Sequence, residues 1–242
     1  MLSRWKKSVL LQSTPPLYWW MLVGSLSFAM VPTWWTQLDL NTASLFDGES
    51  AQVVSASWWW VEWINVNIPF AFRVALGLVL VGWFVAKRST HAAAWRRPLA
   101  FIFLAAVMGP GIVVNAGVKD NWQRARPYQV ENFGGTQQFT RAAVPTDQCN
   151  SNCSFVSGHV ACGFFLTSLM LVHRRRQVAW AVTGTAAGLV IGFARMSAMD
   201  HWLSDVLWAY PITLLSSLLV WICLSWLFHP SGTDQLQSAA KT

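Results

Sequence analysis

The stretch Ala194–Asp205, which reads ARMSAMDHWLSD, joins two long apolar segments of the chain. It carries Arg195, His201 and Asp205 in one short polar connection. His201 and Asp205 are four residues apart, so they share one face where the chain is helical. The carboxylate can accept the proton of one ring nitrogen and leave the other as a nucleophile or base, while Arg195 offers a fixed charge to an anion. Because ionisable groups beside membrane-length segments are usually functional, the stretch predicts a site rather than a simple connection.

The composition of the chain predicts an integral membrane protein. Of its 242 residues, 54% are hydrophobic and only 11% are charged, whereas soluble domains carry about 25% charged residues. Most of six apolar segments are long enough to cross a hydrocarbon core of about 30 Å, and the fourth is short. We therefore expect an all-α, six-helix transmembrane bundle that forms a single domain over residues 1–242. The six segments are Leu17–Leu38, Ile64–Ala86, Leu99–Val118, Gly158–Val172, Val178–Ala194 and Trp202–Phe228.

The net charge of +7 is interpreted as a topology signal. If the N-terminus lies inside and the six helices alternate, most Lys and Arg fall on the inner side, as the positive-inside rule expects. Residues 1–16 and 230–242 are then cytoplasmic tails, residues 39–63 form an outer loop, and residues 119–157 form an outer active-site loop. We expect the bilayer to be the partner of the chain and expect no nucleic-acid binding. The sequence predicts no particular oligomeric state.

Two features around the second apolar segment leave alternatives open. The residues SASWWWVEW, at 55–63, are interpreted as a helix lying at the outer membrane interface, with the wall of a lipid-entry groove as the alternative. Arg73 lies inside the segment, where a charge must pair, snorkel or face a cavity. It either reaches the headgroups or contacts a second anionic group of a substrate.

Two of the four cysteines, Cys149 and Cys153, fall in the outer loop before the fourth apolar segment. A pair of cysteines in an oxidising compartment predicts a disulfide. The alternative is a metal site that these two residues share with His159. That alternative lacks an obvious fourth ligand, so the disulfide is favoured and no metal is expected.

A second polar stretch, Lys119–Pro127, reads KDNWQRARP and falls on the same predicted side as the first. Lys119 supplies a point charge and Arg126 a planar fork of donors, both suited to phosphate oxygens. Arg124 in the same stretch is interpreted as an ordinary loop or headgroup charge. Asp200, next to His201, is likewise interpreted as a solvated carboxylate.

A third stretch, Ser157-Gly158-His159, opens the fourth apolar segment. The free N–H groups and the positive dipole end at the start of a helix favour an anion, and Gly158 lets the backbone come close to it. His159 can donate a proton to a leaving oxygen while His201 attacks phosphorus. Together the three stretches predict a phosphate site on the outer side.

The spacings K-x6-R-P, S-G-H and R-x5-H-x3-D, in this order and at these helix ends, resemble those of the PAP2 superfamily of membrane lipid phosphatases. The resemblance extends over nearly the whole chain. It implies that His201 forms a phosphohistidine, that Asp205 orients His201, and that His159 protonates the leaving group. It also implies that no metal or other cofactor is needed. The residues implied to hold the phosphate oxygens are Lys119, Arg126, Ser157, Gly158 and Arg195.

Two positions depart from the pattern of that superfamily. Val156 stands where Pro usually precedes Ser-Gly-His, and Ala194 stands where Ser usually precedes the arginine. The first change removes turn rigidity and the second removes a hydroxyl group. Neither removes a charge or a histidine, so activity is expected to survive.

The sequence thus predicts a lipid phosphatase that acts at the periplasmic face of a bacterial inner membrane, with both termini cytoplasmic. Its substrate would be a phosphomonoester or pyrophosphate of lipid A, undecaprenyl pyrophosphate, phosphatidylglycerol phosphate or phosphatidic acid. The polar loop 128–152 and Arg73 favour the first two. The alternatives are a lipid phosphotransferase that uses the same histidine and a non-catalytic lipid-phosphate binder or transporter.

Overall fold

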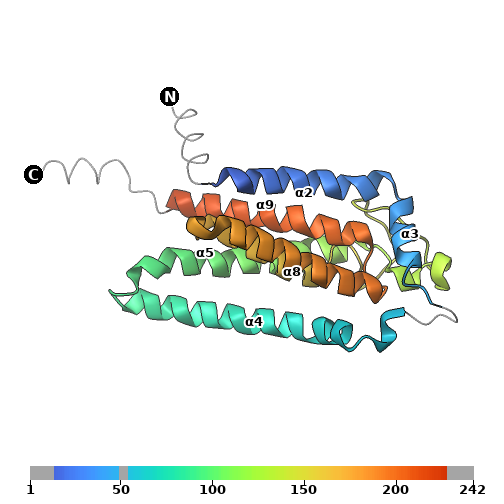
Figure 1. Ribbon diagram of the computed structural model, residues 1–242, viewed down its shortest axis with the longest axis horizontal. Coiled ribbons are helices and arrows are strands. Elements are labelled where there is room, and N and C mark those ends of the chain that lie inside the picture. Colours follow the sequence, from blue (N-terminus) through green and yellow to red (C-terminus); the bar gives the residue numbers. More distant parts are fainter. Residues whose placement is uncertain (1–13, 49–53, 228–242) are drawn as a thin grey trace, which may run out of the picture.

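The chain folds into a bundle of helices that run roughly along one common axis (Figure 1). The structure is a computed structural model, and it describes residues 14–48 and 54–227. Within these ranges there is no β-strand, and Val130 and Gln137 form an isolated bridge. The predicted all-α class is therefore confirmed. The predicted tails fall mostly outside the described residues.

Long helices form the body of the bundle, and short turns of helix join them. The elements in chain order are α2 (Pro16–Trp34), α3 (Gln37–Ser44), η2 (Val54–Ser57), α4 (Trp59–Arg88), η3 (Ala93–Trp95), α5 (Arg96–Ala106), η4 (Val107–Lys119), α6 (Asp120–Trp122), η5 (Pro127–Gln129), η6 (Glu131–Phe133), α7 (Gly158–Phe164), η7 (Phe165–Leu171), η8 (Arg174–Arg176), α8 (Gln177–Ser197) and α9 (Leu203–Leu227).

Four helical stretches of the described chain are long and apolar enough to cross a membrane. They are Trp59–Arg88, Ala93–Lys119, Arg174–Ser197 and Leu203–Leu227. The stretch Gly158–Leu171 is also apolar but shorter. Their length and composition indicate a multi-pass membrane protein, as the sequence predicts. The count of six membrane helices stays a prediction.

The third of these stretches shows how the sequence shapes the end of the bundle. Pro110 has no N–H to donate within a helix, and after Ala106 the backbone widens into the π-helical turns of η4. These turns continue to Lys119 at the end of the stretch. The widened segment therefore delivers Asn115 and Lys119 to the end of the bundle at which α8 gives way to α9.

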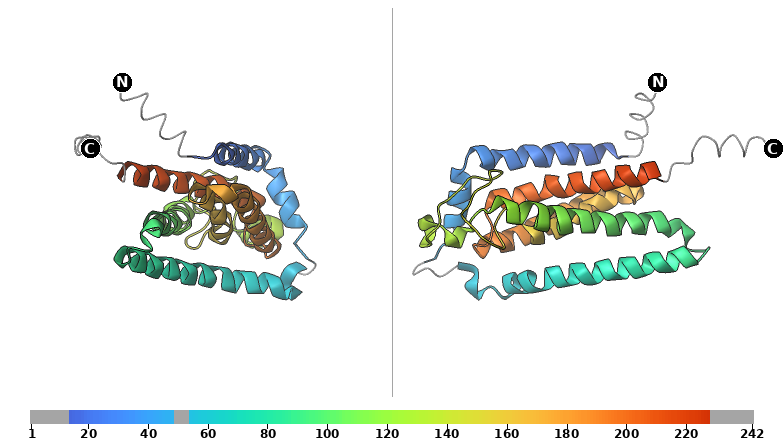
Figure 2. Two further views of the ribbon diagram at one scale, coloured as in Figure 1. Left: turned by 60° about the vertical axis from the view of Figure 1, so that its left-hand side comes forward. Right: turned by 180° about the vertical axis from the view of Figure 1, so that it is seen from behind.

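Helix α4 lies along one side of the bundle in every view (Figure 2). The tryptophan-rich segment is not a separate helix: Trp58 precedes α4, and the tryptophans after it lie in the first turns of α4, which continues to Arg88. The position of these turns at the membrane interface stays a prediction. The buried residues of α4 are Val61 and Ile64 near its start and Ala86 near its end. The helix is therefore fully buried only at points near its two ends, whereas its middle contacts the bundle through the partly buried Phe72 and Leu76 and exposes its other face.

Helices α7 and α8 approach each other closely because α8 carries glycines at their contact. A Cβ atom added at Gly188 would lie 2.1 Å from Cδ1 of Phe164, so no larger residue fits without a shift. Small residues at such contacts let membrane helices pack backbone to backbone. This close contact fixes the start of α7 relative to the end of α8.

One end of the bundle is capped by α3 and by the loop that connects α6 to α7. A hydrophobic cluster around the buried Trp202 joins these parts to the turn between α8 and α9. Its other buried members are Ala43, Phe46, Ala125, Val130 and Met199. The predicted outer loop 39–63 therefore includes a packed helix, α3, and the predicted active-site loop is anchored to the bundle.

Candidate active site

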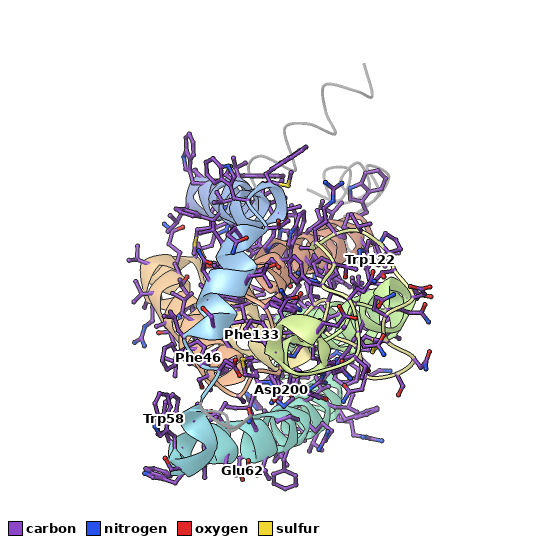
Figure 3. The ribbon with its side chains drawn as sticks, turned by 90° about the vertical axis from the view of Figure 1, so that its right-hand side faces the viewer. Phe46, Trp58, Glu62, Trp122, Phe133 and Asp200 are labelled. Atoms are coloured by element: carbon purple, nitrogen blue, oxygen red, sulfur yellow. A yellow bond between two sulfur atoms is a disulfide. The ribbon has the colours of Figure 1, made fainter. Side chains whose placement is uncertain are left out.

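The polar residues of the three sequence stretches gather at the capped end of the bundle. Figure 3 views this end directly and places Asp200 near the middle of the end face. Phe46 and Phe133 are labelled on one side of Asp200, and Trp58, just before α4, and Glu62 of α4 lie on the other side. The turn between α8 and α9 thus lies in the centre of the site, with α3, α4 and the long loop around it.

Asp200 binds two of the predicted phosphate-binding arginines at once. Its Oδ2 lies 3.0 Å from Nη2 of Arg195, and its Oδ1 accepts a hydrogen bond from Nη1 of Arg126. The Asp200 side chain is 20% exposed, whereas the two arginines are nearly buried. The interpretation of Asp200 as a solvated carboxylate is wrong. Its carboxylate lies where two guanidinium groups converge, which is also a position suited to a phosphate.

His201 follows Asp200 and is buried beside Asp205. Its Nδ1 lies 3.7 Å from Oδ2 of Asp205, and neither ring nitrogen has a hydrogen-bond partner among the described residues. Burial lowers the pKa of His201 from 6.5 to about 3, and this effect outweighs the opposing influence of Asp205. The imidazole is therefore neutral at physiological pH, which is the form that can act as a nucleophile.

Asp205 is held in place by donors from three directions. It accepts hydrogen bonds from Nη1 of Arg124 at 2.6 Å, from the backbone N–H of Trp202 at 2.9 Å, and from the hydroxyl of Ser154. These bonds fix the carboxylate that faces His201. They also supply the hydrogen-bond donors that a completely buried carboxylate needs.

Arg124 is the functional residue that the sequence interpretation missed most clearly. It is fully buried, and besides Asp205 it binds Oδ2 of Asp39 at 2.8 Å. Asp39 in turn accepts the backbone N–H of Ser204 at 2.8 Å. Arg124 is therefore not a loop or headgroup charge: it connects α3 to the start of α9 behind His201.

His159 reaches the same site through Asn65 of α4. Nε2 of His159 lies 3.0 Å from the backbone oxygen of Asn65, and the side-chain oxygen of Asn65 accepts a hydrogen bond from Arg195 at 2.7 Å. A carbonyl oxygen can only accept a hydrogen bond, so His159 carries a proton on Nε2. Its Nδ1 is left to take up and release a proton. Both histidines interact electrostatically with Arg195 and are thus brought to one site.

Ser157 and Gly158 mark the start of α7 at this site. The hydroxyl of Ser157 is buried without a partner among the described residues, as is Nε of Arg195. Unpartnered buried polar groups are uncommon in proteins, so these atoms point to a polar ligand. Glycine fits closely at position 158, because a Cβ atom there would lie 2.6 Å from Oδ1 of Asn115 and the Asn115 side chain or the start of α7 would have to shift.

The two remaining predicted cations lie at different places. Lys119, at the end of η4, interacts electrostatically with His159 and so belongs to the site. Arg73 lies on the exposed part of α4, eight residues beyond Asn65 and so roughly 12 Å along the helix. The structure therefore gathers Lys119 with the histidines and leaves Arg73 apart from them.

Cys149 and Cys153 form a disulfide in the loop before α7. The bond takes up two of the three ligands that the alternative metal site required. Between these cysteines, the backbone oxygen of Asn152 accepts hydrogen bonds from Nε and Nη2 of Arg126 at 3.1 and 2.9 Å. The disulfide thus lies directly behind one of the phosphate-binding candidates. In the described ranges no group of three or more His, Cys, Asp or Glu is arranged to hold a metal ion.

The two positions that depart from the resemblance are both fully buried. Val156 and Ala194 belong to the hydrophobic cluster that also contains Val160 and Ile191. They pack the start of α7 against the end of α8. Their side chains therefore contribute to the support of the site.

The fold and the site together define the class of this protein: a multi-pass membrane phosphatase. The chain belongs to the PAP2 superfamily, whose model matches residues 99–229. The matched region contains every predicted catalytic and phosphate-binding residue. It begins after Arg73, Asn65 and Asp39, which lie outside it.

Three characterised relatives have the same name, lipid A 4'-phosphatase. The protein of Francisella tularensis subsp. novicida is 32% identical over 191 residues, which are 76% of this chain and 85% of that protein. The protein of Rhizobium etli is 32% identical over 162 residues, or 66% of this chain and 62% of its own length. The protein of Rhizobium leguminosarum is 32% identical over 159 residues, which are 65% of this chain and 66% of that protein. No solved structure is significantly similar to this chain.

Proposed function

We propose that this phosphatase hydrolyses a phosphate ester or pyrophosphate of a membrane lipid, with lipid A as the first candidate substrate. One observation carries the proposal: Arg126 and Arg195 converge on a single carboxylate next to His201. A phosphate that took the place of this carboxylate would meet both arginines and a neutral imidazole at once. The names of the three relatives support lipid A.

In the proposed reaction, a ring nitrogen of His201 attacks the phosphorus atom. A bond forms between nitrogen and phosphorus, and the bond from phosphorus to the lipid oxygen breaks. The bound phosphate anion raises the proton affinity of His159, so that Nδ1 also carries a proton in the substrate complex, and Nδ1 gives this proton to the departing oxygen. Asp205 balances the positive charge that develops on the ring of His201. Water then attacks the phosphohistidine, gives a proton back to His159, and releases inorganic phosphate.

Five groups are proposed to stabilise the phosphoryl oxygens during both steps. Two of them, Arg126 and Arg195, bind the Asp200 carboxylate in the structure, and charged donors are most effective where water is excluded. The Ser157 hydroxyl and the Nε of Arg195, both buried and without a partner among the described residues, support this role. The proposed groups are Lys119, Arg126, Ser157, the Gly158 amide and Arg195. No metal is assigned a step in this mechanism.

The exposed middle of α4 supports sideways entry of the lipid. A substrate in a bilayer must bring its head to the site while its tails stay in the hydrocarbon. Between Ile64 and Ala86, α4 has no fully buried residue, although Phe72 and Leu76 pack against the core, so the tails are proposed to pass along the exposed faces of the helix. Arg73 lies on this stretch and is proposed to contact a second anionic group on a large headgroup. Lipid A and undecaprenyl pyrophosphate fit this better than a simple phosphatidic acid.

The proposed setting is a bacterial inner membrane with the site on the periplasmic face. The distribution of Lys and Arg along the sequence supports this orientation. A disulfide next to the site supports it too, because disulfides persist in oxidising compartments.

Release of inorganic phosphate from a panel of purified lipids tests the proposal. The panel contains lipid A, undecaprenyl pyrophosphate, phosphatidylglycerol phosphate and phosphatidic acid, each with the parent protein and with His201→Ala. We expect release from at least one lipid without any added acceptor, no detectable release by His201→Ala, and a loss of about 100- to 10,000-fold in His159→Ala. Vanadate should inhibit and EDTA should not.

Each contrary result has a distinct meaning. Phosphate release only when an acceptor lipid is present would favour phosphotransfer. Lipid binding with equal turnover by the parent protein and His201→Ala would favour a binder or transporter. Strong inhibition by EDTA would overturn the metal-free mechanism.

A further inference from the structure

A cavity of about 460 Å³ lies at the end of the bundle opposite to the candidate active site. It is bordered by the start of α5, the turn between η7 and α8, and the last turns of α9, at the left of Figure 1. Along α9 the distance from Leu203 at the active site to Trp221 at the cavity is roughly 27 Å, at 1.5 Å per residue. The cavity is therefore separate from the catalytic machinery.

The rim of this cavity is strongly basic. Arg97, Arg174 and Arg175 line it together with His173, and no Asp or Glu is among its described lining residues. Arginine is the side chain best suited to phosphate, because its planar fork can bind two oxygens. The charge of the rim therefore favours a ligand with a phosphate group.

The wall of the cavity is apolar, and one of its residues carries a buried donor without a described partner. Leu171, Val172 and Trp221 line it, and the indole N–H of Trp221 is buried without a hydrogen-bond partner among the described residues. A buried donor without an acceptor is costly in an apolar surrounding. An oxygen atom of a bound headgroup would satisfy it.

The surroundings of the cavity indicate where its ligand comes from. The neighbouring helices expose apolar side chains to the bilayer, among them Leu104 on α5, Val178 on α8 and Leu219 on α9. A ligand whose phosphate sits at the rim could lay apolar chains against these surfaces. A soluble anion would use the rim alone.

We propose that this cavity binds the headgroup of an anionic phospholipid from the leaflet at that end of the bundle. Basic pockets between membrane helices commonly hold such headgroups. The phosphate contacts the arginines of the rim, and the indole N–H of Trp221 donates to a headgroup oxygen. The lipid is a structural ligand at this position and is not a substrate, because the histidines are at the other end.

Native mass spectrometry of the full-length protein in detergent, titrated with single lipids, tests this site. Phosphatidylglycerol should bind with an apparent Kd at least fivefold below that of phosphatidylcholine. The variant Arg174→Gln/Arg175→Gln should abolish this preference. Arg176→Gln is the matched control, because Arg176 is exposed in the same turn but does not line the cavity. Trp221→Phe keeps the ring, removes the donor, and should weaken phosphatidylglycerol binding about threefold.

Three results would overturn the proposal. The parent protein could bind both lipids equally, or Arg176→Gln could lower the preference as much as the double variant, which would indicate general surface attraction. Inorganic phosphate at the same concentration could displace phosphatidylglycerol, which would indicate a soluble-anion site. Retained phosphate release by each variant shows that it is folded, and Trp221→Phe tests the site without changing any charge.

Discussion

Nη1 of Arg124 lies 2.6 Å from Oδ1 of Asp205, and both side chains are fully buried. Arg124 also binds Asp39, so one guanidinium holds together two carboxylates that come from α3 and α9. The nearer carboxylate faces His201. This arrangement makes the position of the proposed nucleophile depend on a residue that does not touch the substrate. Arg124 is therefore a positioning residue, and the structure predicts that its loss affects both stability and turnover.

Replacement of Arg124 by Ala should destabilise the protein by about 3–5 kcal/mol, because it leaves two carboxylates buried without their cation. Arg124→Lys keeps the charge but cannot reach both carboxylates with a planar fork, so we expect a folded protein with a lower kcat and an unchanged KM. Thermal unfolding and steady-state kinetics in detergent measure these effects. Arg141→Ala, at an exposed position of the same loop, is the control and should change stability by less than about 0.5 kcal/mol. Equal effects of the two alanine variants would refute the assignment.

Asp200→Asn tests whether the Asp200 carboxylate competes with substrate phosphate. Its ion pairs with Arg126 and Arg195 must be broken before a phosphate can bind both arginines. Partly exposed ion pairs contribute up to about 1 kcal/mol each, so vanadate should inhibit the variant about five- to tenfold more tightly. Asp147→Asn makes the same charge change at an exposed site of the loop and should leave vanadate inhibition as it is. Weaker vanadate inhibition in Asp200→Asn would show that the carboxylate helps to bind the anion.

The sequence could predict the site because its chemistry is concentrated in short stretches at the ends of apolar segments. Arg195, His201 and Asp205 lie within one such stretch, so their proximity follows from local geometry. Asn65 and Asp39 are different, because they reach the site only through packing of α4 and α3. An asparagine near tryptophans or an aspartate in a polar connection carries no spacing signal of its own.

Arg124 and Asp200 show a second limit of sequence reasoning. The sequence interpretation places both in solvent, because an isolated charge in a polar stretch is usually exposed. The cluster around Trp202 covers the end of the bundle, where Arg124 is fully buried and Asp200 is partly buried. The spacing of Arg124 and Arg126 carries a signal for the burial of Arg124. In an extended stretch, residues two apart face the same side, so Arg124 would face the same side as the predicted phosphate-binding Arg126. The aromatic segment differs for another reason: it is continuous in sequence with the apolar segment that follows, and α4 begins at Trp59 and runs through both.

Reduction of the disulfide should act on Arg126 through Asn152. A bond that closes so short a loop stabilises a protein by about 2 kcal/mol in the chain-entropy model. Without it, the backbone oxygen that accepts two hydrogen bonds from Arg126 is less firmly placed. We expect Cys149→Ser/Cys153→Ser to raise KM several-fold with little change in kcat, as measured with a soluble phosphate ester. Cys223→Ser, which removes a free exposed thiol, is the control. An unchanged KM in the double variant would separate the disulfide from the site.

Gly158→Ala should damage the site by steric conflict. The added methyl group would lie 2.6 Å from Oδ1 of Asn115, so either the start of α7 or the Asn115 side chain must move. We expect a kcat loss of about tenfold or more, because a shift of about 1 Å at a catalytic group is enough for that. Asn115→Ala combined with Gly158→Ala should recover part of the activity by making room. Gly77→Ala, where the new methyl group meets nothing within 4 Å, should be silent. No recovery in the combined variant would count against this steric account.

Protonation of His201 should make the protein less stable in acid. The pKa of His201 falls from 6.5 to about 3 on folding, so below pH 6.5 the unfolded chain binds a proton that the folded protein does not. The free energy of unfolding is therefore unaffected by His201 above about pH 6.5. It decreases as the pH falls from 6.5 towards 3, by up to about 1.4 kcal/mol per pH unit. In His201→Gln, which cannot titrate, the decrease in unfolding temperature between pH 6.5 and 5 should be smaller than in the parent. His91→Gln, at an exposed position, should behave like the parent. If His201→Gln loses stability as steeply as the parent, the acid sensitivity arises elsewhere, and His201 is not held neutral by its burial.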